Sequence, residues 1–82
     1  MQKGLNSDLN IKGKMVHIQT EDWGVGNPFI VTRIFVNGAV KQTIKTSYNE
    51  ALKNGPVNQA QALEQAIRRQ HQKAIDELWS GL

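Results

Sequence analysis

Two histidines and two adjacent carboxylates are the side chains of this sequence best suited to metal binding or proton transfer: His17, Glu21, Asp22 and His71. Imidazole and carboxylate groups are common metal ligands. His17 and Glu21 point the same way from a predicted strand, but at this spacing they lie too far apart to share an ion without a bend. His71 falls on the apolar stripe of a predicted helix. We therefore expect no metal, and we expect His71 to be a packed, hydrogen-bonded core histidine.

The remaining polar candidates do not form a catalytic set. Glu21 and Asp22 are adjacent, so in an extended segment they diverge and cannot act as an acid/base pair; hydrogen bonding in the loop is the better interpretation. Ser47 has no base placed near it, and Tyr48 is expected to pack at the corner of the sheet with its hydroxyl on a polar partner. Residues 24–26 lack the third glycine and the helix of a dinucleotide loop. We expect no catalytic residue, no cofactor and no enzymatic activity.

A predicted β-hairpin at residues 28–48 organises the chain. Asn37-Gly38 lies between two runs rich in β-branched and aromatic residues, and both residues readily adopt the positive φ of a type I′ turn. A regular two-residue turn places Phe35 opposite Val40 and Val31 opposite Ile44. This register predicts a core face composed of Phe29, Val31, Phe35, Val40 and Ile44.

The register leaves a second face of the same hairpin with large aliphatic side chains and lysines. The neighbouring strand at residues 11–21 contributes Val16 and Ile18 to the core and its alternate side chains to this second face. The two strands of the hairpin and this strand are therefore predicted to share one surface. Its members are Met15, His17, Gln19, Ile30, Thr32, Ile34, Val36, Lys41 and Lys45.

One long helix follows the hairpin. Asn58 and Gln61 stand in capping-box order, and the apolar residues recur at helical spacing up to about Trp79, where Ser80-Gly81 ends the helix. Its stripe consists of Ala60, Leu63, Ile67, His71, Ala74 and Leu78, with Ile75 at the edge. The fold predicted is α+β: a three-stranded antiparallel meander with one long C-terminal helix packed on one face. Residues 1–10 are expected to be disordered or frayed, and residues 11–82 to form a single domain.

Composition limits the function classes. The 82 residues include no cysteine, so neither disulfides nor thiolate-bound zinc can stabilise the domain. No apolar run is long enough to span a bilayer, and the N-terminal segment lacks the apolar stretch of a signal peptide; we expect a cytoplasmic protein with no membrane association. The net charge of +3 is a mild indication of polyanionic partners.

Four short motifs resemble a small uncharacterised bacterial domain family with an HxQTED, KTSY and QH pattern. They are residues 17–22, Phe35 with Gly38, residues 45–48, and Gln70-His71 followed by Leu78. The resemblance covers about residues 14–81. It implies a bacterial origin and a self-contained module, sometimes attached to other domains, and it implies no activity, ligand or catalytic residue.

The apolar second face favours a protein-interaction or self-association module. One helix covers one side of a sheet, and apolar patches flanked by lysines are typical of protein–protein contacts. The competing interpretation is that residues 1–14 or 49–57 fold back as a lid. Nucleic-acid binding through basic residues of the last helix and third strand is the alternative function. The hairpin is similar to the middle of a double-stranded-RNA-binding domain, but the first helix and the lysine-rich entry to the last helix are absent.

Overall fold

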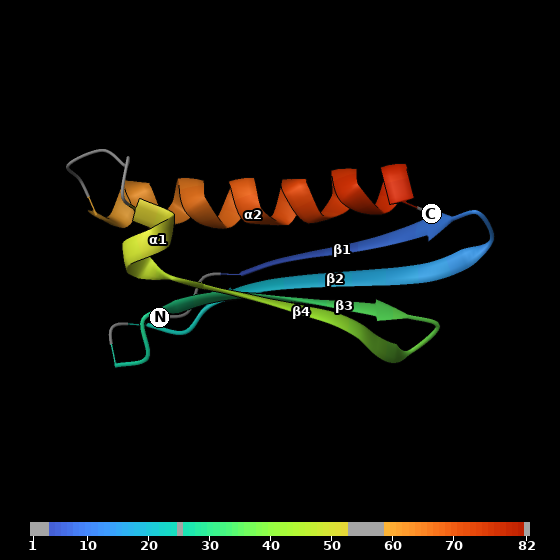
Figure 1. Ribbon diagram of the computed structural model, residues 1–82, viewed down its shortest axis with the longest axis horizontal. Coiled ribbons are helices and arrows are strands. Elements are labelled where there is room, and N and C mark those ends of the chain that lie inside the picture. The colour runs from blue at the N-terminus through green and yellow to red at the C-terminus, as the bar shows by residue number, and fades with distance from the viewer. Residues whose placement is uncertain (1–3, 25, 53–58, 82) are drawn as a thin grey trace.

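The computed structural model describes residues 4–24, 26–52 and 59–81, and it shows an α+β fold in two layers (Figure 1). A four-stranded antiparallel sheet in the order β1-β2-β3-β4 forms one layer, and a long helix packed against it forms the other. The elements are β1 (Gly4–Ile11), β2 (Lys14–Asp22), β3 (Phe29–Val36), β4 (Ala39–Ser47), α1 (Tyr48–Leu52) and α2 (Gln59–Gly81).

The prediction of a type I′ turn at Asn37-Gly38 is confirmed. Asn37 has φ 50° and Gly38 has φ 86°, and the side-chain Oδ1 of Asn37 also accepts a hydrogen bond from the amide of Met15 at 3.2 Å. A second tight turn of the same kind joins β1 to β2, with φ 52° at Lys12 and 82° at Gly13. Positive φ at both central residues matches the twist of the flanking strands, which explains why both hairpins close with two residues.

The N-terminal segment is the first correction. Residues 4–10, expected to be frayed, belong to β1, so the meander has four strands and not three. Along β1 the inward positions hold Leu5, Ser7, Leu9 and Ile11 and the positions between them are polar or glycine, so Leu5, Leu9 and Ile11 point toward the helix. A strand with this alternation gains both a full ladder with β2 and an apolar inner face, which offsets the entropy of ordering it.

The assignment of the two sheet faces is the second correction. Phe35 pairs with Val40 as predicted, but the register then shifts at an irregularity between Ile34 and Phe35, so that Thr32, and not Val31, pairs with Ile44. One extra residue on β4 moves every later side chain of that strand to the other face. Ile44 therefore lies on the same side as Ile30, Thr32 and Ile34.

The face beneath α2 is consequently the face that the regular hairpin register predicted to lie away from the helix. Ile30 and Ile34 are buried, at 0% and 2% exposure, and they lie beside Val16 and Ile18 of β2. Val16 and Ile18 were expected in the core, which is confirmed. Phe29, Val31 and Phe35, expected under the helix, lie on the opposite face.

The helix α2 follows the predicted stripe closely. Its buried or partly buried apolar side chains contact the sheet in two clusters, one around Ile34 and Ala74 and one around Ile30 and Ile67. Ala62 and Ala66 join the stripe, and their small side chains permit a close approach to the sheet. The predicted cap at Asn58 and the side chain of Ala60 lie outside the described residues. No helix in the described part of the chain is both long enough and apolar enough to span a membrane.

Candidate functional site: the open face of the sheet

Among the described residues, no helix or strand covers the face of the sheet opposite α2, and we call it the open face; Val31, on this face, is nevertheless buried at 3% exposure. Strand pairing places the following side chains on it: Asn6, Asp8, Met15, His17, Gln19, Glu21, Phe29, Val31, Arg33, Phe35, Val40, Thr43 and Lys45. Met15 is 69% exposed and Val40 is 58% exposed, which is unusual for large apolar side chains. The open face is therefore apolar at the hairpin end of the sheet and polar at its margins.

An aromatic and cationic cluster occupies the other end of the open face. The guanidinium of Arg33 lies 5.8 Å from the ring centroid of Trp23, and the ammonium of Lys45 lies 5.3 Å from the same ring. Lys45 also lies 4.2 Å from the centroid of Phe29. The β2–β3 loop is held by a hydrogen bond from the amide of Trp23 to the carbonyl of Phe29 at 3.0 Å. Cation–π contacts thus fix both cations over aromatic rings, with their charge still accessible to a partner.

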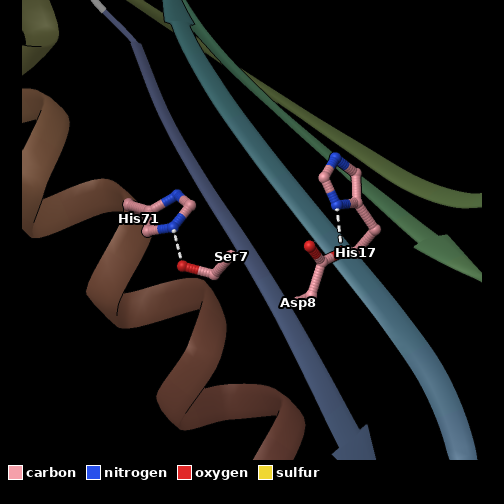
Figure 2. A network of polar contacts seen from close by, with 4 residues as sticks. All are labelled: Ser7, Asp8, His17 and His71. Carbon is pink, nitrogen blue, oxygen red and sulfur yellow. Dashed lines mark hydrogen bonds and ion pairs between the residues drawn. The ribbon is translucent and has the colours of Figure 1, made fainter.

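A shallow depression lies at the hairpin end of the open face. It measures about 400 Å³ and is lined by Met15, His17 and Phe35, among others. The rings of His17 and Phe35 are 5.8 Å apart and tilted by 46°. His17 is held by Asp8, whose Oδ1 lies 2.6 Å from its Nδ1 (Figure 2). This arrangement presents an imidazole and a phenyl edge beside exposed aliphatic side chains.

The charges of the open face separate into two halves. The β1–β2 half carries Asp8 and Glu21, and the β3–β4 half carries Arg33 and Lys45. The β1–β2 half therefore has two negative charges, with His17 also in it, and the β3–β4 half has two positive charges. A surface divided in this way is complementary to a second copy of itself.

The structure brings together only part of the predicted interaction surface. Met15, His17, Gln19 and Lys45 lie on the open face. The aliphatic residues that motivated the prediction do not, since Ile30, Thr32 and Ile34 are buried beneath α2 and Val36 is half-buried on that same side. Lys41 occupies the irregularity in β4 and borders a groove on the helix side instead. The register shift explains the error, because it exchanges the faces for β4 and with them the apparent core.

On the helix side, a chain of polar side chains crosses the core and includes His71; Figure 2 shows its contact between His71 and Ser7. His71 is 5% exposed; its Nδ1 lies 2.8 Å from Thr20 Oγ1, and its Nε2 lies 2.8 Å from Ser7 Oγ. Thr20 in turn lies 2.8 Å from the hydroxyl of Thr32, which accepts from the Gln70 amide at 3.0 Å. The prediction that His71 is a packed, hydrogen-bonded core histidine is confirmed.

Both ring nitrogens of His71 are engaged by hydroxyl groups, which can donate or accept. Gln70 donates to Thr32 through its amide nitrogen and anchors the other end of the chain. Burial lowers the pKa of His71, because it disfavours the charged imidazolium.

The predicted roles of Asp22 and Tyr48 are also confirmed. The Tyr48 hydroxyl donates to Asp22 Oδ1, which also accepts from the Gly24 amide at 2.9 Å. Burial, together with the hydrogen bond to the Asp22 carboxylate and its negative charge, raises the pKa of Tyr48 to about 12. Ser47 ends β4, and its Oγ accepts from the Glu50 amide at 3.2 Å as the cap of α1. These contacts join the β2–β3 loop to the β4–α1 corner.

The chemistry of these groups is structural. Thr20 and Thr32 are fully buried and His71 nearly so, so no substrate reaches them. Across residues 4–24, 26–52 and 59–81, no three His, Cys, Asp or Glu side chains gather as metal ligands would. Ser7, Thr20 and Gln70 are the members that the sequence did not reveal, and Gln70 carried the clearest signal. Its position next to His71, at the border of the apolar stripe, was the available signal.

Comparison with known proteins adds no assignment. The chain has no significant match to any protein-family model, to any curated protein or to any solved structure.

Proposed function

We propose that this protein is a non-enzymatic self-association module that pairs with a second copy of itself through the open face. The observation that carries the proposal is the division of that face into an acidic β1–β2 half and a basic β3–β4 half around exposed Met15 and Val40. Exposed apolar side chains bordered by charge are typical of interfaces.

A two-fold axis parallel to the strands gives the best match between the acidic half of one copy and the basic half of the other. Rotation about such an axis lays the β1–β2 half of one copy over the β3–β4 half of the other, so Asp8 and Glu21 approach the side that carries Arg33 and Lys45. The two sheets then stack about 10 Å apart, with α2 of each copy on the outside. Four strands of eight or nine residues offer an area near the lower end of specific interfaces, which bury roughly 800 Å² per partner.

Sedimentation equilibrium tests the proposal with variants that spare the core. Met15 and Val40 are exposed, so M15E and V40E should each leave the circular dichroism spectrum unchanged. Each places a charge at the apolar centre of the interface, where desolvation without a partner costs several kcal/mol, and the dimer should dissociate. Trp79 is 53% exposed on α2, so W79E is the matched control and should remain dimeric. A wild-type protein that is monomeric at high micromolar concentration contradicts the proposal.

A charge exchange tests the orientation. E21K and K45E alone place like charges across the interface and should weaken association. The double variant E21K/K45E exchanges the two halves and should recover most of the loss, since a two-fold axis brings the exchanged charges together again.

Nucleic-acid binding is the second candidate, and the cluster of Trp23, Arg33 and Lys45 favours it, because stacking on aromatics and basic side chains is how single strands are bound. The other basic residues do not converge on this cluster: Arg68 pairs with Glu64 at 3.1 Å, and Lys73 is exposed on α2. Fluorescence anisotropy with a labelled single-stranded oligonucleotide decides. Binding that weakens in W23A and becomes tighter as the salt concentration is lowered would support this candidate over self-association.

A further inference from the structure

The helix α2 leaves part of the inner face of the sheet uncovered. It packs against β1, β2 and β3, most extensively against β2, and it makes no comparable approach to β4. Strands about 4.8 Å apart make this sheet wider than one helix of about 10–12 Å diameter. The short helix α1, which follows directly after Ser47, packs on β3 and β4 at the other end of the sheet. The inner face of β3 and β4 at the hairpin end therefore lies beside α2 and is not covered by it.

A groove of about 290 Å³ occupies this position. Its floor and walls are apolar: Ile34 and Ile44 come from the sheet, and Ala74 and Leu78 come from α2. A groove of this size is at the lower limit of small-molecule sites, which are mostly apolar with a few polar groups that orient the ligand. It lies on the opposite side of the sheet from the open face, and the proposed dimer leaves it accessible.

Two lysines border the sheet side of the groove. Lys14 begins β2 and Lys41 lies in the irregular part of β4, so they flank the end of β3 from its two neighbouring strands. Glu77 lies across from them on α2, and within the described part of the chain no ion pair joins it to either lysine. The polar rim on the sheet side is thus cationic, and the interior is aliphatic.

We propose that this groove binds a small amphiphile that has one carboxylate and a short alkyl chain. The alkyl chain lies between Ile44 and Leu78, where it removes apolar surface from water at about 25 cal/mol per Å². The carboxylate lies on the sheet side of the mouth, where Lys14 and Lys41 donate charge-assisted hydrogen bonds. The apolar interior disfavours neutral sugars, and the two lysines outnumber the single carboxylate of Glu77 at the rim, which disfavours cationic amphiphiles.

Octanoate is the probe, titrated below its micelle concentration into ¹⁵N-labelled protein and followed by amide chemical shifts. The proposal predicts saturable shifts at Ile44, Ala74 and Leu78, and no saturation with octyltrimethylammonium. K14Q/K41Q should weaken octanoate binding about fivefold, in keeping with two exposed charge contacts. R68Q/K73Q removes two positive charges from exposed positions of α2 away from the groove, and it should bind like wild type.

Three outcomes overturn the proposal. They are an octanoate titration without saturation, equal affinity of K14Q/K41Q and R68Q/K73Q, and shifts centred on Met15 and Phe35. The last outcome places the amphiphile on the open face. The oligomeric state is measured without octanoate, so failure of the groove and failure of self-association are distinguishable.

Discussion

Ser7 and Asp8 are neighbours in β1, yet they hold histidines on opposite faces of the sheet. Ser7 Oγ lies 2.8 Å from Nε2 of His71 beneath the helix, whereas Asp8 Oδ1 lies 2.6 Å from Nδ1 of His17 on the open face (Figure 2). Alternation of side chains along one strand thus divides the polar groups into a buried, structural set and an exposed set available to a partner.

The buried set predicts an acid-sensitive fold. The pKa of His71 is lower in the folded protein than its ordinary value of 6.5. Below pH 6.5 the unfolded chain therefore binds a proton that the folded chain does not, and the free energy of unfolding falls by up to about 1.4 kcal/mol per pH unit. Urea unfolding at several pH values should show this slope in wild type and a flatter one in H71Q. The variant H17Q retains His71 and its contribution; equal slopes in wild type and H71Q would contradict the assignment.

The two faces predict opposite consequences for adjacent truncations. Ile34 is 2% exposed beneath α2, so I34A should lower the free energy of unfolding by about 2–5 kcal/mol. Phe35 is half-buried on the open face, and F35A should cost the monomer about 1 kcal/mol. Denaturant unfolding at low protein concentration makes the comparison. A larger loss in F35A than in I34A would restore the face assignment that the regular hairpin register implies.

The sequence predicts much of this fold, since the local signals are strong. Asn37-Gly38 identified the hairpin, and the 3.6-residue period identified α2 together with the buried position of His71. The irregularity in β4 could not be predicted, because either a regular or a bulged register pairs apolar with apolar residues near the turn. Only the packing of Ile30, Ile34 and Ile44 together against α2 decides between them.

Residues 4–10 were missed for a related reason. Leu5 and Leu9 alternate with polar residues, but two leucines give a weak strand signal beside Asn, Ser and Asp, which favour turns. Burial on β2 and α2 overrides that preference. The candidate site was half predicted: Met15, His17, Gln19 and Lys45 were placed on a shared exposed face, whereas Trp23, Phe35 and Val40 reached that face only through the corrected register.

The irregularity in β4 predicts that one deletion is tolerated. Removing Lys41 leaves Val40 opposite Phe35 and Gln42 opposite Ile34, so the ladder becomes regular and Ile44 stays in the core. The melting temperature should change little, by the equivalent of about 1 kcal/mol or less. Deleting Thr20 from the regular strand β2 moves half of that strand to the wrong face, and this control should unfold. Similar losses in the two deletions would exclude the bulge.

The contact between Tyr48 and Asp22 predicts an alkaline limit. The pKa of Tyr48 rises from 10.0 to about 12 on folding, so its contribution is complete below pH 10 and is lost as the pH rises from 10 to 12. Y48F lacks the ionisable hydroxyl and should be less stable at neutral pH by about 1–3 kcal/mol, with the difference from wild type vanishing toward pH 12. A difference that persists unchanged at pH 12 would show that packing, and not the hydrogen bond, stabilises this corner.

The proposal of self-association through the open face is tested most directly by amide chemical shifts recorded as the protein is diluted from millimolar to low micromolar concentration. A dimer through this face predicts concentration-dependent shifts at Met15, His17, Phe35 and Val40, with resonances of the outer side of α2, such as Arg68 and Lys73, unchanged. Spectra that are independent of concentration, or shifts confined to α2, would contradict it.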